Sequence, residues 1–111
     1  NILLDESGGP NHVGNFCFAP LHSNTQTGEL IYTPSYYYIG HFSKCIKAGA
    51  KRIISSSSRS QLLTTAFKNE DGKVVVIVMN QGNIKTPYNL WINGKAAACT
   101  ALPHSISTLI L

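Results

Sequence analysis

The second half of the chain is patterned for β-strands, and this pattern limits the possible folds more than any other feature. From Lys51 onward, apolar and polar residues alternate in short runs. Asp71-Gly72 and Asn93-Gly94, dipeptides typical of β-hairpins, separate two pairs of runs. Six strands are predicted: KRIISSSS (51–58), LLTTAFKN (62–69), KVVVIVMNQ (73–81), YNLWING (88–94), AAACTAL (96–102) and SISTLIL (105–111). Short strands recurring at intervals of about 8–12 residues favour an antiparallel β-sandwich over 51–111.

One helix is predicted before these strands, over residues 34–47 (PSYYYIGHFSKCIK). Thr33 can serve as its N-cap, Pro34 suits the first helical position, and Gly49 suits a C-terminal cap. Apolar residues at spacings of three and four form a stripe, namely Tyr38, Ile39, Phe42, Cys45 and Ile46. Residues 1–33 carry turn signals and are expected to be irregular except for a short strand over 29–33. The chain therefore divides into a β domain over 51–111 and an attached segment over 1–50.

The chain is poor in charge. Charged residues make up 13% of it, about half of the usual share of ~25%. A small domain with so few charges is expected to rest part of its surface against other protein. The net charge is only +4, and the basic residues gather near the predicted end of the helix, where they offset the helix dipole. No nucleic-acid-binding signature accompanies them, so we expect no nucleic-acid partner.

Cysteine and histidine spacing indicates no metal or cofactor site. The three Cys residues form no CxxC pair, and their odd number excludes a fully paired disulfide framework, so we expect small buried side chains. The four His residues lack metal-ligand spacing. His41 and Cys45 are four apart on the predicted helix, where ordinary packing explains them better than a nucleophile. The longest apolar run, VVVIVM (74–79), is much shorter than the ~20 residues that span a bilayer.

The acidic residues offer no catalytic pair. There are five of them: Asp5, Glu6, Glu29, Glu70 and Asp71. A glycosidase needs two carboxylates about 5–9.5 Å apart that flank one bond. Neighbours such as Asp5 and Glu6 point to opposite sides of an extended chain. Glu70 and Asp71 belong to a predicted exposed turn, and Glu29 follows a turn glycine. The residues therefore predict that this chain holds no catalytic residue of its own.

Two stretches in the first half resemble glycoside hydrolase family 30. NILLDESGGPNHVGNF (1–16) contains Gly-Gly-Pro-Asn and Asn-Phe in the family's order, and PSYYYIGHFSKCIKAGAKRI (34–53) is similar to its Gly-His-Phe-Ser-Lys segment. The family includes glucosylceramidases, β-1,6-glucanases and xylanases. The resemblance is strong over 1–54 and looser in the strand region, where pattern agrees more than identity.

The resemblance implies a position for each part of the chain. Residues 1–50 would end a (β/α)8 barrel, with a site-lining loop over 5–20 and the eighth barrel helix over 34–47, and 51–111 would form most of the sandwich. The family retains configuration with two Glu residues on earlier barrel strands, so the catalytic pair is expected outside these residues. Asn15 and Phe16 match the family's Asn-Phe and are the expected substrate-binding residues. The expected partners are a carbohydrate substrate and the barrel of the same parent, which the resemblance implies is secreted or periplasmic.

Two alternatives remain open at this point. Asn15 can bind a sugar hydroxyl or hydrogen-bond its own loop, as Asn often does in turns. His12 stands where glucosylceramidases have an aromatic residue, and Gly14 stands where they have a basic one. These two differences argue against a lipid glucoside as the substrate. The chain can also be a free-standing carbohydrate-binding or accessory module, which would display aromatic residues. Trp91 is predicted to face outward if Leu90 and Ile92 face the core. Weak self-association through the helix stripe is expected in either case.

Overall fold

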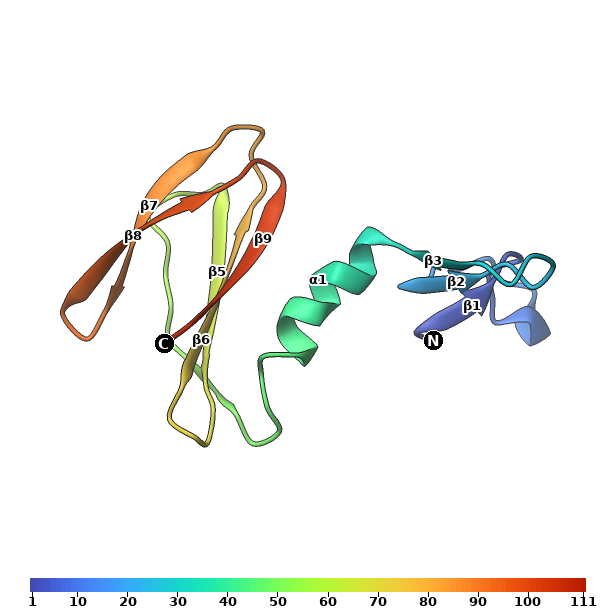
Figure 1. Cartoon of the computed structure of the whole chain (residues 1–111), viewed down its shortest axis with the longest axis horizontal. Helices are drawn as coiled ribbons and strands as arrows, with labels where there is room; N and C mark the ends of the chain where they lie inside the picture. The colour runs from blue at the N-terminus through green and yellow to red at the C-terminus, as the bar shows by residue number, and fades with distance from the viewer. The chain divides into compact units, whose positions relative to one another are not determined.

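The computed structural model describes all 111 residues, which form two compact units, residues 1–40 and 41–111 (Figure 1). Helix α1 (Pro34–Ser43) begins in the first unit and ends in the second. None of its helices is long and apolar enough to cross a membrane. The predicted division into a barrel end over 1–50 and a sandwich over 51–111 stays a prediction.

The first unit contains a small three-stranded sheet. Its order is β1 (Leu3–Asp5), β2 (Leu21–Ser23) and β3 (Leu30–Tyr32), with β1 parallel and β3 antiparallel to β2. A short 3₁₀ helix, η1 (Asn11–Val13), lies in the loop between β1 and β2. The strand predicted over 29–33 is confirmed as β3. The expectation of otherwise irregular chain was wrong, because strands of three residues are too short to show an alternating pattern.

Helix α1 begins at Pro34 as predicted but ends at Ser43, four residues early. Thr33 directly precedes the helix, and its carbonyl accepts from the Tyr36 N–H (3.0 Å), while its hydroxyl donates to the Pro20 carbonyl at 3.0 Å. The chain after the helix is held by Asn69, which donates from Nδ2 to the Cys45 carbonyl (3.0 Å) and accepts from the Lys47 N–H (3.1 Å). The Cys45 carbonyl and the Lys47 N–H therefore pair with Asn69 and not with other residues of a helix. Gly49 is therefore a turn residue with φ +83°, not a helix cap.

The second unit is the predicted antiparallel sandwich. Its strands are β4 (Lys51–Ile53), β5 (Leu62–Lys68), β6 (Val74–Asn80), β7 (Thr86–Ile92), β8 (Lys95–Ala101) and β9 (Ser105–Ile110). One sheet has the order β4-β5-β6-β9, and β7 pairs with β8 as a separate hairpin. All six predicted strands are found, although the first stops at Ile53, before the serine run.

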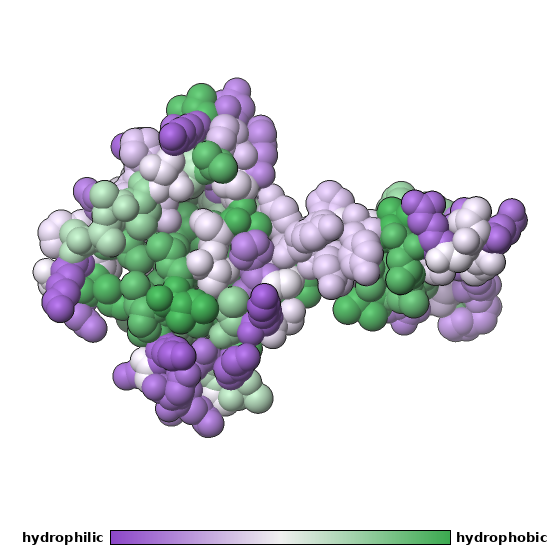
Figure 2. Space-filling view, in the orientation of Figure 1, coloured by the Kyte–Doolittle hydropathy of each residue, from purple (hydrophilic) through white to green (hydrophobic).

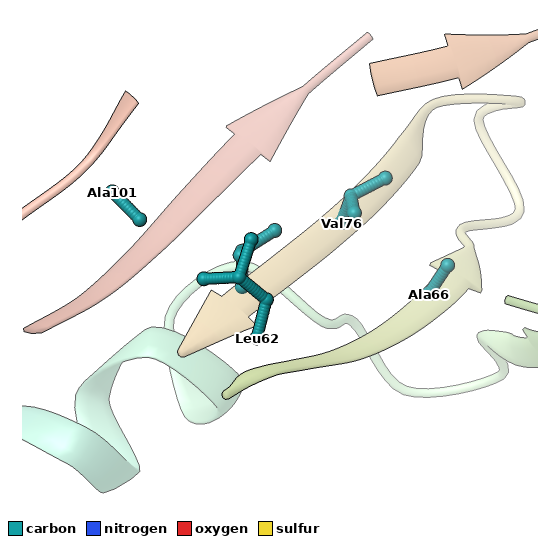
Figure 3. Close-up of a cluster of buried hydrophobic side chains, with 5 residues drawn as sticks. Leu62, Ala66, Val76 and Ala101 are labelled. Carbon is teal, nitrogen blue, oxygen red and sulfur yellow. The ribbon is translucent and has the colours of Figure 1, made fainter. Parts of the chain in front are cut away.

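The sandwich core lies between the sheet and the hairpin. Its buried members are small or branched: Leu62, Ala66, Val76, Val78 and Ala101 (Figure 3). Strand β6 is also buried on its other face, where Val75 and Ile77 are at most 3% exposed. His41 lies on that face, with its Nδ1 2.8 Å from the Thr108 hydroxyl of β9. The end of α1 is therefore fixed to the sheet by His41, which is packing and not nucleophile chemistry.

The two layers do not close completely. An apolar cleft of about 1050 Å³ lies between them, and hydrophobic surface is visible there in Figure 2. Tyr88 of β7 lines this cleft, and burial, followed by its neighbour Cys99, raises the pKa of its phenol. All three cysteines are free, but the expectation that they are buried was wrong: Cys17 is exposed, and Cys45 and Cys99 are half-buried.

Candidate functional site

The loop after β1 is closed by Asp5. Its carboxylate accepts hydrogen bonds from the Ser7 N–H (3.0 Å) and from Asn11 Nδ2 (2.9 Å), and its carbonyl accepts from the Gly8 N–H (3.1 Å). These three bonds hold the Gly8-Gly9-Pro10 turn against the end of the strand. Asp5 therefore has a structural role, which leaves it poorly suited to donate or accept a proton in catalysis.

Gly8 is required where it stands, because Phe16 packs on it. Its φ is +70°, a conformation that L side chains rarely adopt. A Cβ at this position would lie 2.7 Å from Cδ2 of Phe16 and 3.1 Å from the Cys17 carbonyl oxygen. The Gly-Gly-Pro turn thus forms the support on which the Phe16 ring rests.

His22 of β2 fastens the other end of the loop. Its Nε2 accepts a hydrogen bond from the Ala19 N–H (3.0 Å), and its Nδ1 lies 3.2 Å from the Asp5 carbonyl oxygen. An accepting Nε2 carries no proton, so the ring is neutral with its proton on Nδ1, from which it donates to Asp5. No local pattern in the sequence indicates this role, because His22 is 17 positions from Asp5.

Aromatic rings form a row along the loop. Phe16 and Phe18 meet edge to face with centroids 5.2 Å apart, and Phe18 meets His22 in the same manner at 5.8 Å. Phe16 and Phe18 remain 63% and 81% exposed. The Asn15 side chain beside them is exposed and makes no hydrogen bond to the loop. The two predicted site residues, Asn15 and Phe16, thus both have exposed side chains, and Phe18 is a further exposed ring that the sequence had not indicated.

Three other carboxylates, those of Glu6, Glu70 and Asp71, lie close to other groups of the chain. Both oxygens of Glu6 accept hydrogen bonds from Thr25, one from its N–H (2.9 Å) and one from its hydroxyl (2.7 Å). The backbone bond from Thr25 is the largest influence that lowers the pKa of Glu6 from its ordinary value. Asp71 lies 3.8 Å from Lys73 in an exposed ion pair, and Glu70 lies over Gly49. No group of three His, Cys, Asp or Glu side chains could hold a metal ion.

Comparison with known proteins assigns both halves of the chain. The Glycosyl hydrolase family 30 TIM-barrel domain matches residues 1–46, and the beta sandwich domain of the same family matches residues 49–109. Putative glucosylceramidase 1 of Caenorhabditis elegans is 34% identical over the whole chain, and the lysosomal acid glucosylceramidase of Mus musculus is 34% identical over 81% of it.

Solved structures agree with the sequence relatives. The crystal structure of SrfJ from Salmonella typhimurium covers all of this chain with a TM-score of 0.94 and 37% identity. The endo-β1,6-glucanase BT3312 covers 97% with a TM-score of 0.83 and 25% identity. The chain spans 25% of each of these structures, 23% of the nematode relative and 18% of the mouse enzyme. On the match of its sandwich and barrel regions, the chain belongs to glycosyl hydrolase family 30.

Proposed function

We propose that the chain is the C-terminal part of a retaining β-glycosidase that acts on β-glucosides or related glycans, and that it lacks the catalytic carboxylates. The observation that carries the proposal is the pair of adjoining family matches, barrel over 1–46 and sandwich over 49–109. The bonds that engage Asp5 and Glu6 support the second part, because neither carboxylate is free to act on a substrate.

In this proposal, loop 5–20 forms one wall of the sugar pocket, at the C-terminal face where barrel enzymes place their sites. Asn15 donates or accepts a hydrogen bond with a sugar hydroxyl, which its unengaged amide supports. The exposed ring of Phe16 gives the sugar an apolar surface. A carbohydrate substrate and the remaining barrel of the parent enzyme are the partners that follow.

The alternative of a free-standing carbohydrate-binding module has less support. Such a module would consist of the sandwich alone, whereas residues 1–46 match a barrel domain. The β1–β2 pair is also parallel, as pairs are in α/β barrels and not in a purely antiparallel module.

A chimera tests the proposal. The corresponding portion of the mouse glucosylceramidase is replaced by residues 1–111, and hydrolysis of an aryl β-glucoside is measured. Soluble chimera is expected to be active and to release the β-anomer first, and Asn15→Ala and Phe16→Ala should each lower kcat/KM about 10-fold or more, the loss expected for a direct contact to the substrate. Unchanged kcat/KM in both variants would contradict the assigned site.

The 111-residue chain alone provides the complementary measurement. It is expected to leave the aryl β-glucoside intact. Hydrolysis that disappears in Glu6→Gln or Glu29→Gln would show that the chain holds a catalytic carboxylate and would overturn the proposal.

A further inference from the structure

The chain has one tryptophan, and it is not used in the core. Trp91 lies in β7 and is 69% exposed, which confirms its predicted outward direction. Its neighbours Leu90 and Ile92 are half-buried, and Leu90 packs against the core. A tryptophan can bury more apolar area than any other side chain, so its exposure on a regular strand indicates a use at the surface.

The surface around Trp91 is made of small or uncharged side chains. Alternation along the paired strands places six residues on the side away from the core, here called the outer hairpin face: Pro87, Asn89, Trp91, Ala96, Ala98 and Thr100. Ala96 is directly opposite Trp91, and Ala98 is opposite Asn89. Side chains opposite one another in a pair lie about 5 Å apart at Cβ, and diagonal neighbours about 7–8 Å. Because the two alanines end at Cβ, nothing on the partner strand covers the indole ring.

We propose that the outer hairpin face binds a neutral oligosaccharide. A sugar ring stacks on the indole of Trp91 through its C–H face, and the Asn89 amide and Thr100 hydroxyl hydrogen-bond the hydroxyls of the next unit. The inference rests on the proposed function, since it takes the glycan substrate of the parent enzyme as the ligand. The site is separate in sequence and in fold from the loop with Asn15 and Phe16, and it binds without cleaving.

Charge and size favour this occupant over others. The outer hairpin face carries no ionised side chain, although the whole chain has a net charge of +4. It therefore complements an uncharged, hydroxyl-rich ligand and offers nothing to a phosphate or a carboxylate. The six residues of this face are also far fewer than the roughly 20–30 per side of a stable protein interface, so the face by itself fits a small ligand better than a protein.

The single tryptophan makes the test direct. Emission from the 111-residue chain, excited at 295 nm, is titrated with β-1,6- and β-1,3-gluco-oligosaccharides, and affinity electrophoresis in gels containing the corresponding polysaccharides is run in parallel. We expect a saturable change in emission and retarded migration with at least one of the glucans. Trp91→Ala should weaken binding on the order of 10-fold or more, as for a central aromatic contact.

Matched variants keep the proposal falsifiable. Ala98→Glu adds charge and bulk beside the indole at an exposed position, so it should abolish binding while Trp91 still reports an intact fold. Tyr37→Ala, which removes another exposed aromatic residue, should bind as the original chain does. Binding that survives both Trp91→Ala and Ala98→Glu, no binding to either glucan, or a Trp91-dependent dimer seen by sedimentation without sugar would each overturn it. None of these binding measurements requires catalysis. If the chimera is inactive but the 111-residue chain still binds a glucan through Trp91, the proposed function is overturned and this inference stands.

Discussion

Replacing Gly8 by Ala should disturb the candidate site, whereas replacing Gly14 by Ala should not. Both glycines have left-handed φ values, +70° and +66°, so both substitutions carry a backbone strain of about 1–2 kcal/mol. Only at Gly8 would the new Cβ meet other atoms, at 2.7 and 3.0 Å from the Phe16 ring, while Gly14 has nothing within 4 Å. Overpacking costs about 1–3 kcal/mol. Because the Phe16 ring is 63% exposed and can rotate away, we expect an extra cost near the lower end, about 1 kcal/mol.

Native-state hydrogen exchange measures this difference within the first unit. The Leu21 N–H, which donates to the Ile2 carbonyl at 3.0 Å, reports the free energy of opening of the sheet edge beside the loop. Nuclear Overhauser contacts between the rings of Phe16 and Phe18 report the position of the Phe16 ring. Gly8→Ala should lower the opening free energy more than Gly14→Ala and weaken these ring contacts. Equal opening free energies in the two variants, with unchanged ring contacts, would refute the reasoning.

Three further outcomes are expected. Asn80→Ala should lower the free energy of unfolding by about 1–3 kcal/mol in urea titrations, because a side chain that is 1% exposed loses its bonds to the Ile84 and Leu102 carbonyls and leaves the Gly82 N–H without its partner, and unchanged stability would contradict this. The bonds from Thr25 lower the pKa of Glu6, so the ionised carboxylate stabilises the folded chain. This stabilisation is complete above the unfolded-state pKa of about 4.3 and is lost as pH falls through the lower folded-state pKa. Hydrogen exchange at the Thr25 N–H should show this loss, and Glu6→Gln should remove the pH dependence. Weak dimers should form through α1, because none of its residues is buried. Phe42→Ser should reduce this association when sedimentation is measured over a 100-fold concentration range. A chain that is monomeric at millimolar concentration would contradict the prediction.

The sandwich could be predicted from the sequence because its signals are local. Alternation of apolar and polar residues places each strand, and Asp71-Gly72 and Asn93-Gly94 place two turns, both with the positive φ that the hairpin requires. The direction of Trp91 followed from the same alternation. The prediction that loop 5–20 lines a site rests on resemblance to a family and not on a local pattern in the loop itself.

The features that were missed depend on residues distant in sequence. The early end of α1 follows from Asn69, which is 22 to 24 positions from the groups that it binds. The structural role of Asp5 follows in part from its contact with His22, 17 positions away. Strands β1 and β2 exist because they pair with each other and with β3, and three residues are too few to indicate this beforehand. A pattern within one segment carries no information about such partners.

Most contacts that shape the candidate loop are made within the first 25 residues, and Thr33 adds hydrogen bonds to the Ala19 and Pro20 carbonyls at the loop's end. Asp5 holds the turn, His22 joins Asp5 to Ala19, and Glu6 is held by Thr25. None of these bonds involves the exposed side chains of Asn15, Phe16 or Phe18. The conformation of the loop and the groups that it presents are therefore set by different residues.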